Sequence, residues 1–187
     1  MIVNPRGTFG SGKSTIVRKV MERYAERDPA MTPGRKQPYG YTCYRADGGP
    51  NLWVVGHYET RCGGADTIDR IDDIYAQVNG AAERGYDVIY EGGALVQSDW
   101  RRAAAAAARF PTLIIVLDVP IEMCLEGIRA RREARGDTRP LNPKNTIGRA
   151  RDTLRNAEHL RTNNVAVEKF QDRDLAAVRA LGALGWS

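Results

Sequence analysis

The 187-residue chain is 42% hydrophobic and 27% charged, which is enough apolar content to bury the core of one compact domain without cross-links. No stretch approaches the roughly 20 continuous apolar residues of a membrane span, and the three cysteines (Cys43, Cys62 and Cys124) lack metal-ligand spacing. We therefore expect an intracellular protein with reduced thiols, no signal peptide and no membrane partner, and its net charge of +5 favours phosphate-rich ligands.

The chain opens with a glycine-rich loop. Residues 7–15, GTFGSGKST, fit the pattern G-x-x-x-x-G-K-[ST] at every fixed position. Glycines let the backbone aim N–H groups at phosphate oxygens, Lys13 adds a cation for the β- and γ-phosphates, and Ser14 offers a hydroxyl to Mg²⁺. We assign nucleotide binding to the glycine loop through Gly7, Thr8, Gly10, Ser11, Gly12, Lys13, Ser14 and Thr15. The alternative is a glycine-rich turn that binds no nucleotide.

The segments flanking the glycine loop have strand and helix character. Residues 1–3 are apolar, and a helical stripe of apolar side chains predicts a helix that continues over residues 16–27. Pro5 cannot donate a hydrogen bond to a sheet, so we predict that the first strand ends at about Asn4.

Two runs rich in aromatic and β-branched residues follow a polar connector. They cover residues 39–45 and 52–58, and turn-forming residues separate them. We predict an antiparallel hairpin, or a hairpin-like insertion beside the main sheet, over residues 39–58.

The connection after this hairpin carries several polar groups where an acceptor hydroxyl could meet a base. Glu59 and Asp66 are candidate general bases, and His57, Tyr58 and Arg61 are candidate substrate contacts. Ordinary loop polarity, or helix capping by Asp66, is the alternative for any one of them.

A buried-type strand at residues 87–90 delivers Glu91 to its carboxyl end. A carboxylate there can bind Mg²⁺ or accept a proton from an attacking hydroxyl, and Gly92 and Gly93 allow close approach of a ligand. We assign Glu91 to metal binding and catalysis; a cap or an ion pair at the sheet edge is the alternative.

Helices and strands continue to alternate in the second half. Strands are predicted at residues 112–117 and 165–167, and helices at about residues 98–109, 121–134, 143–160 and 172–184. This alternation predicts a single α/β domain over residues 1–187, with a mainly parallel sheet covered on both faces and ligands at the carboxyl ends of its strands.

One arginine-rich segment carries the entire excess of basic over acidic residues. Residues 129–151 contain eight basic and two acidic residues, a net charge of +6, so the total of +5 leaves −1 for the remainder. Helical spacing relates two pairs of these arginines: Arg129 and Arg132 are three residues apart, and Arg131 and Arg135 are four residues apart. We predict a mobile lid over residues 129–142, with Arg129 and Arg132 catalytic and Arg131 and Arg135 binding nucleotide.

Two alternatives apply to the lid segment. A charge run is usually a solvated face, and about half of these arginines would then pair locally. Asn142 precedes Pro143, which is typical of a helix N-cap followed by proline at the first helical position. We also consider Asn142 a candidate substrate contact.

The glycine loop, the strand end LDVP at residues 117–120 and the lid sequence RARREAR at residues 129–135 resemble small P-loop kinases of the nucleotide and nucleoside kinase type, over nearly the whole chain. The resemblance implies a P-loop NTPase fold with a five-stranded parallel sheet, ATP as phosphate donor, Mg²⁺ and a closing lid. On it, Lys13 and Ser14 match the ATP and Mg²⁺ positions.

The segments GHYET at residues 56–60, CGGADT at residues 62–67 and RPLNPKNT at residues 139–146 look like a bacteriophage group of P-loop kinases that includes the 5-hydroxymethyluracil DNA kinases. This likeness implies phosphorylation of the hydroxymethyl group of a base in phage DNA, in the host cytoplasm. The chain departs from thymidylate kinases, because the strand before Glu91 lacks their Asp-Arg pair.

Two other functions stay open at this point. The first is a kinase for a small molecule, nucleoside or mononucleotide, and the second is a nucleotide-dependent switch or ATPase. A basic lid on a positive protein favours a polymer of phosphates as partner. The oligomeric state is open.

Overall fold

Strands and helices alternate along the chain in a computed structural model that describes residues 1–60 and 63–186. The strands are β1 (Ile2–Gly7), β2 (Glu26–Ala30), β3 (Gly40–Tyr44), β4 (Leu52–Val55), β5 (Asp87–Ile89), β6 (Thr112–Leu117) and β7 (Ala166–Phe170). The helices are α1 (Lys13–Met21), the 3₁₀ helix η1 (Ala65–Thr67), α2 (Ile71–Glu83), α3 (Ala94–Ser98), α4 (Trp100–Ala107), α5 (Ile121–Glu133), α6 (Pro143–Thr162) and α7 (Arg173–Ala183).

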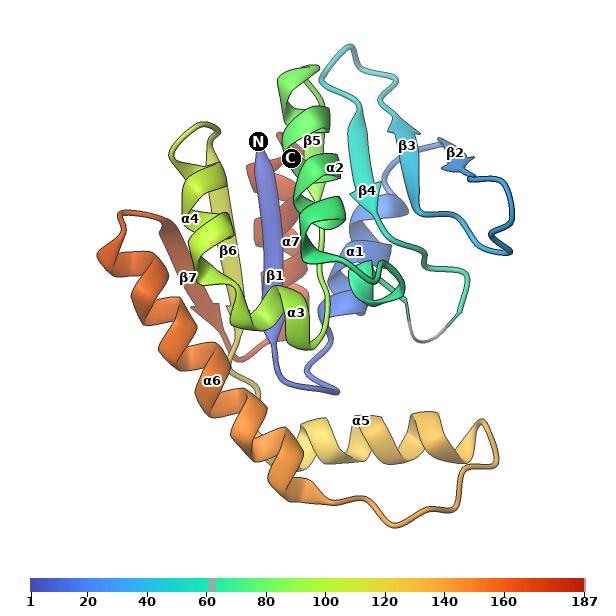
Figure 1. The fold of residues 1–187 in the computed structure, drawn as a ribbon, viewed down its shortest axis with the longest axis vertical. Helices are drawn as coiled ribbons and strands as arrows, with labels where there is room; N and C mark the ends of the chain where they lie inside the picture. The colour runs from blue at the N-terminus through green and yellow to red at the C-terminus, as the bar shows by residue number, and fades with distance from the viewer. Residues whose placement is uncertain (61–62, 187) are drawn as a thin grey trace.

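The strands of the described residues form one seven-stranded sheet in the order β2-β3-β4-β5-β1-β6-β7 (Figure 1). From β4 to β7 in this order neighbouring strands are parallel, whereas β3 is antiparallel to both β2 and β4. The predicted α/β class and mainly parallel sheet are confirmed. The predicted count of five strands is wrong, because β2 and β3 extend one edge of the five parallel strands.

The predicted hairpin is present as β3 and β4, but it is not a separate insertion. β4 pairs with β5 through Leu52 and Asp87, so the hairpin joins the main sheet. β2 was not predicted, since its charged sequence ERDPA lacks a strand pattern and overlaps the end of the predicted first helix. It forms an edge strand whose side chains are mostly exposed, a position where Pro29 is tolerated.

β1 runs through Pro5 to Gly7, so the predicted strand end at Asn4 is wrong. The N–H of Tyr90 donates to the carbonyl of Val3, which places the backbone groups of Val3, and of Pro5 two residues later, on the β5 side. The β1–β5 pairing covers only Ile2 and Val3. An N–H at position 5 would point towards β5, and proline supplies none; on that side the carbonyl of Tyr90 accepts instead from the side-chain amide of Asn4 at 2.7 Å.

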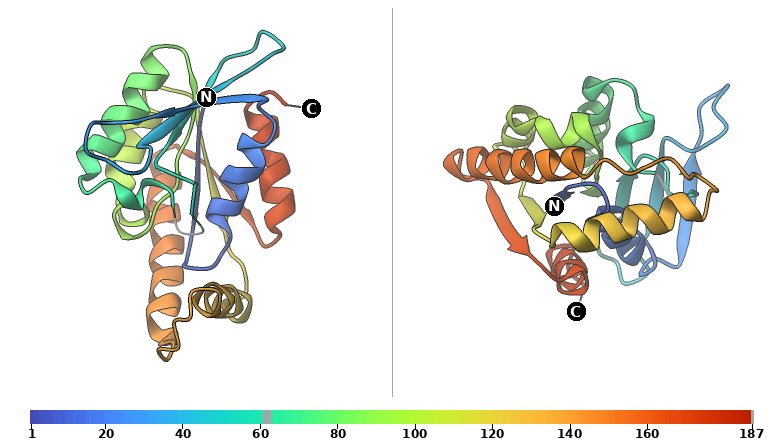
Figure 2. Two further views of the ribbon diagram at one scale, coloured as in Figure 1. Left: turned by 90° about the vertical axis from the view of Figure 1, so that its right-hand side faces the viewer. Right: turned by 90° about the horizontal axis from the view of Figure 1, so that it is seen from below.

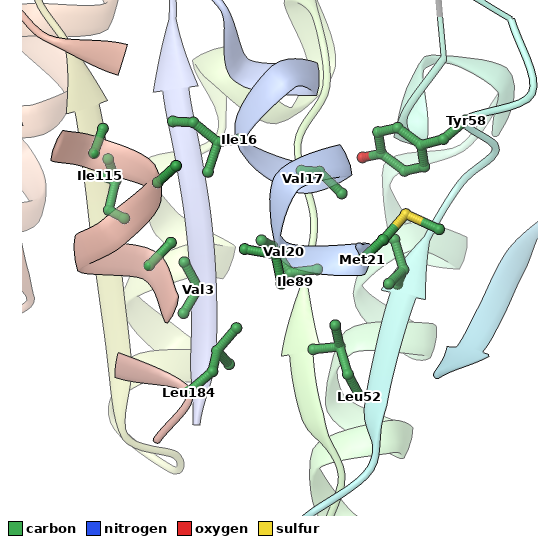
Figure 3. Packing of buried hydrophobic residues seen from close by; sticks show 14 of the residues in the cluster. Val3, Ile16, Val17, Val20, Met21, Leu52, Tyr58, Ile89, Ile115 and Leu184 are labelled. Atoms are coloured by element: carbon green, nitrogen blue, oxygen red, sulfur yellow. The ribbon is translucent and has the colours of Figure 1, made fainter. Parts of the chain in front are cut away.

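Helices cover both faces of the sheet (Figure 2). Val3 and Ile89 point to the face covered by α1 and α7, where they pack among buried apolar side chains (Figure 3). Ile2 and Val88 alternate to the other face, which α2, α4 and α6 cover. Near-complete burial on both faces explains the uninterrupted apolar runs of β4 and of residues 113–117 in β6.

The carboxyl ends of the parallel strands meet at one edge of the sheet, and α5 lies across that edge (Figures 1 and 2). After β1 the chain builds β4 and β5 on one side and then β6 and β7 on the other. β1 therefore lies where the strand order reverses, which is the place where open α/β sheets bind ligands.

Two further features concern the cysteines and the apolar character of the helices. Cys43 and Cys124 are buried free thiols, while Cys62 lies outside the described residues. Among the helices that the structure describes, none is both long and apolar enough to cross a bilayer.

Candidate active site

The glycine loop connects β1 to α1 and packs against the first turns of α5. Gly10 and Gly12 have φ angles of 77° and 105°, a region that side chains disfavour. A Cβ atom on Gly10 would lie 2.2 Å from the carbonyl oxygen of Cys124, so the close approach of α5 also requires glycine there. Gly12 is the N-cap of α1 and, within the described chain, no side chain caps this helix. The N–H of Thr15 donates to the carbonyl of Gly12 at 3.0 Å, and the N–H groups of Lys13 and Ser14, which precede it and have no intrahelical acceptor, are available to an anion.

Lys13 lies at the centre of this loop and is only 9% exposed. Its Nζ donates to the carbonyl oxygens of Gly7 (3.1 Å) and Thr8 (3.0 Å). Burial lowers the pKa of Lys13, and the nearby carboxylates of Glu91 and Asp66 oppose that shift. The ammonium group is therefore held inside the loop by weak neutral acceptors, which a phosphate could replace.

Glu91 faces Ser14 across the edge of the sheet. The Ser14 hydroxyl donates to Glu91 Oε1 at 2.7 Å, and Glu91 is only 2% exposed. Burial raises the pKa of Glu91, while the charge of Lys13 and the hydrogen bond from Ser14 act in the opposite direction. Gly64 covers the same carboxylate, since a Cβ atom there would lie 2.4 Å from Oε1.

These oxygens suit Mg²⁺ when a nucleotide is bound. Among the described residues no group of three or more His, Cys, Asp or Glu side chains could hold a metal alone. Mg²⁺ usually binds through one or two carboxylates together with substrate phosphates and waters, so a serine hydroxyl beside one carboxylate fits it. Ser14 and Glu91 would then hold the ion against the phosphates.

Asp66 lies in η1 and reaches the same space from the opposite side. Its Oδ1 accepts a hydrogen bond from the N–H of Gly93. A Cβ atom on Gly93 would lie 2.8 Å from both carboxylate oxygens, so glycine is needed for this contact. Gly92 and Gly93 were expected to allow close approach of a ligand; in the structure the group beside Gly93 is the Asp66 carboxylate.

A buried polar network behind the glycine loop was not predicted. Gln97 is 1% exposed; its side chain accepts from the N–H of Gly7 (3.0 Å) and donates to the carbonyl of Gly92 (3.0 Å). Arg6, which is fully buried, donates to Asn4 Oδ1 at 2.7 Å and to the carbonyl of Asp99 at 3.1 Å. Gln97 therefore fixes the loop after β1 relative to the loop after β5. The signal in the sequence for this network was Arg6, a charged residue directly before the glycine loop.

A cavity of about 520 Å³ lies between the glycine loop and the lid. Predicted site residues from five separate segments line this cavity: Gly10, Lys13, Ser14, Asp66, Glu91, Arg131, Arg132, Arg135 and Asn142. A smaller hollow of about 260 Å³ adjoins it and shares Gly10, Lys13, Ser14 and Arg131. Arg173 borders this second hollow and donates to the carbonyls of Ser11 (2.9 Å) and Gly10 (3.2 Å).

The lid arginines take different positions. Arg135 lines the cavity, and Arg132 lines it while donating to the carbonyls of Arg139 (2.9 Å) and Pro140 (3.3 Å). Arg129 is exposed and lines neither hollow of the described chain. Asn142 accepts from the N–H of Lys144 at 3.0 Å, so it caps α6 and also borders the cavity.

Most polar residues of the 57–66 connection point elsewhere. His57 is buried, which lowers its pKa, and Tyr58 packs in the core with the Arg18 guanidinium 5.7 Å from its ring centroid. Glu59 is exposed and accepts from the Tyr41 hydroxyl at 2.7 Å. None of these three lines the cavity as described, and Arg61 lies outside the described residues.

Comparison with known proteins gives two relatives. No protein-family model matches the chain. The chain is 40% identical over 183 residues to the "5-hmdU DNA kinase" of Pseudomonas phage PaMx11, covering 96% of both proteins. It is 28% identical over 172 residues to the protein of the same name from Delftia phage PhiW-14, which covers 82% of this chain and 61% of that protein.

Proposed function

The chain belongs to the family of phage 5-hmdU DNA kinases, and from this premise we propose that it transfers the γ-phosphoryl group of ATP to the hydroxymethyl oxygen of 5-hydroxymethyluracil in DNA. One observation carries the proposal beyond the family name. A single cavity joins a buried lysine, a serine hydroxyl, two carboxylates and lid arginines, which together form the set that phosphoryl transfer requires. The glycine loop after the central parallel strand supports the P-loop NTPase fold.

ATP binding is the task of the glycine loop. The phosphates would lie over the N–H groups that begin α1, with Lys13 moving from the carbonyls of Gly7 and Thr8 to the β- and γ-phosphates. The rest of the nucleotide would occupy the hollow beside Thr15 and Arg173. Ser14 and Glu91 would hold Mg²⁺, which neutralises charge on the phosphates when it is bound.

The acceptor hydroxyl would enter the 520 Å³ cavity beside Asp66. Its oxygen forms a bond to the γ-phosphorus as the bond to the bridging oxygen of ADP breaks, and its proton passes to a carboxylate. Asp66 is the base we propose, because Glu91 is assigned with Ser14 to Mg²⁺ and Glu59 does not line the cavity.

Lid side chains would stabilise the transferring group. Arg131 borders both hollows and Arg135 borders the larger one, so both can reach the phosphates or the DNA backbone. Arg132 shapes the lid loop, and Asn142 is a candidate acceptor contact. Arg129, His57 and Tyr58 remain candidates that would need a rearrangement, or a contact made by DNA outside the cavity. Arg61, outside the described residues, remains a candidate substrate contact.

Transfer from γ-labelled ATP tests this function. The acceptors are 5-hydroxymethyluracil DNA, unmodified DNA of the same sequence, free 5-hydroxymethyldeoxyuridine and its monophosphate, with Lys13→Ala as the control enzyme. We expect label only in the modified DNA and none with Lys13→Ala. Label in a free nucleoside or nucleotide alone would replace the proposal with a small-acceptor kinase, and release of phosphate without any labelled acceptor would replace it with an ATPase.

DNA as partner also sets the place of action. Phage DNA inside an infected bacterium lies in the cytoplasm, and we propose that the protein acts there.

A further inference from the structure

We infer that the target nucleotide is turned out of the DNA helix into the 520 Å³ cavity, where its base stacks on the ring of Phe9. The inference rests on the proposed function and adds the form in which the DNA is recognised. Three observations carry it: the depth of the reacting groups, the size of the cavity, and an exposed aromatic ring at its wall.

The reacting groups lie too deep for a base that stays stacked. Lys13 and Glu91 are 9% and 2% exposed, and α5 lies across the strand ends that carry them (Figures 1 and 2). A helix with its side chains is about 10–12 Å across. The 5-substituent of a paired uracil projects into a major groove about 12 Å wide, between two phosphate backbones. Its oxygen must come within about 3–3.5 Å of the phosphorus, so on the α5 side a paired base would have to reach across the width of this helix.

The cavity has the size for one nucleotide. Its volume falls in the range of about 300–1,000 Å³ typical of small-ligand pockets, far below that needed for a duplex. Other enzymes that react at a base, and cannot reach it inside a duplex, extrude the target nucleotide and hold it through polar contacts and stacking.

Phe9 supplies the stacking surface. It lies within the glycine loop, is 39% exposed and lines the cavity. The phosphate-binding pattern leaves this position open, so phosphate binding does not explain an aromatic residue there. The Arg149 guanidinium lies 5.8 Å from the ring centroid and restrains the ring from α6. An aromatic face beside a cavity that holds carboxylates suits a base whose substituent must reach them.

The arginine side chains at the rim of the cavity suit the DNA backbone that remains outside it. Arg132, Arg135 and Arg139 line the lid side, within the segment that carries the net charge of +6. Phosphates on either side of an extruded nucleotide would meet these side chains.

The first test varies how firmly the target base is held in DNA. One sequence with a single 5-hydroxymethyluracil is offered paired with adenine, opposite an abasic site, and as a single strand, with kcat/KM measured at saturating MgATP. We expect the abasic and single-stranded substrates to react about 10- to 100-fold faster than the paired one, because the unpairing cost is removed. 2-Aminopurine opposite the target should brighten when the enzyme binds.

Equal kcat/KM for the paired and abasic substrates, without a change in 2-aminopurine fluorescence, would overturn the inference while leaving the kinase function intact. No transfer to any of these DNAs would instead overturn the proposed function.

The second test assigns the stacking role. Phe9→Ala should raise the KM for single-stranded substrate roughly 5- to 150-fold and leave the KM for ATP within twofold, whereas Phe9→Tyr should restore binding. Tyr44→Ala is the matched control, because Tyr44 is 37% exposed, lies on β3 and is remote from the cavity lining. A Phe9→Ala enzyme with unchanged KM for DNA, or with an equal rise in both KM values, would overturn the role of Phe9.

Discussion

Lys13 and Glu91 are buried, oppositely charged groups on neighbouring loops, and each shifts the titration of the other. Burial is the larger effect on both: it lowers the pKa of Lys13 and raises the pKa of Glu91. In the proposed mechanism each side chain acts in its charged form, since the lysine would bind phosphates and the carboxylate would bind Mg²⁺. The two shifts therefore narrow the pH range of the active enzyme from both ends.

This gives a pH prediction. A raised pKa keeps Glu91 protonated to a higher pH than an ordinary glutamate, so kcat/KM should rise with pH through a value above 4.5. A lowered pKa lets Lys13 lose its proton at a lower pH than an ordinary lysine, so kcat/KM should fall again at a pH below 10.5. The measurement is kcat/KM for DNA against pH for the wild type, Glu91→Asp and Glu59→Gln. Glu91→Asp should move the acidic limb, and Glu59→Gln should leave it in place. Loss of that limb in Glu59→Gln would assign the titration to Glu59.

Gly64 tests whether the position of Glu91 matters. Alanine there would be strained at a φ of 85° and would press on Glu91 Oε1, whereas Gly48 has a φ of 81° with nothing within 4 Å of an added Cβ atom. Both alanine variants should lose about 1–3 kcal/mol of folding stability from backbone strain. Only Gly64→Ala should also lower kcat, by roughly 10- to 100-fold. Thermal melting and kcat separate the two effects, and an equal kcat for both variants would show that Gly64 does not position the carboxylate.

At the scale of elements, the lid consists of the end of α5 and the loop that leads to α6. Arg132 joins them through the carbonyls of Arg139 and Pro140, and Asp137 pairs with Arg139 at 2.7 Å. The hydrogen bond from Arg139 lowers the pKa of Asp137, so the pairing persists to low pH. These contacts tie the segment together, which its charge alone did not suggest, while its movement as a lid stays a prediction.

Arg132→Ala should loosen this loop. We expect kcat/KM for DNA to fall about 10- to 100-fold and ATP hydrolysis without acceptor to rise, since an open lid admits water. Arg155→Ala removes the same charge from the exposed surface of α6, where Arg155 pairs with Asp152, and should change neither value by more than twofold. If both variants lost activity equally, net charge rather than loop support would explain the effect.

The sequence predicted the elements that carry strong local patterns and missed those set by tertiary contacts. The glycine loop and the strand before Glu91 were recognisable from spacing and apolar runs. β2 was missed because its charged sequence is a strand only through pairing with β3. Gln97 was missed because its role depends on two backbone groups, those of Gly7 and Gly92, that lie far apart in sequence.

For the whole molecule, the fold gathers charge and reactivity at one edge. Segments around residues 13, 66, 91, 131 and 142 meet in one cavity, and the basic segment of residues 129–151 forms part of its wall. The remainder of the chain has a net charge of −1, so the attraction for a phosphate polymer is directed to this edge. The sequence made the glycine loop recognisable and predicted the lid segment, but only the cavity lining shows that Asp66, and not Glu59, lies beside the glycine loop.

The position of the transferred phosphate tests the central claim most directly. DNA containing 5-hydroxymethyluracil, treated with the enzyme and MgATP, would be digested by a nuclease to 5′-mononucleotides, with no phosphatase present. Tandem mass spectrometry would then locate any extra phosphate on the base, beside a Lys13→Ala reaction. We expect the phosphate on the 5-hydroxymethyl oxygen in the wild-type sample and its absence with Lys13→Ala. Phosphate only at the 5′ end of the DNA, or on free nucleotides, would contradict the claim that this cavity accepts the hydroxymethyl group of a DNA base.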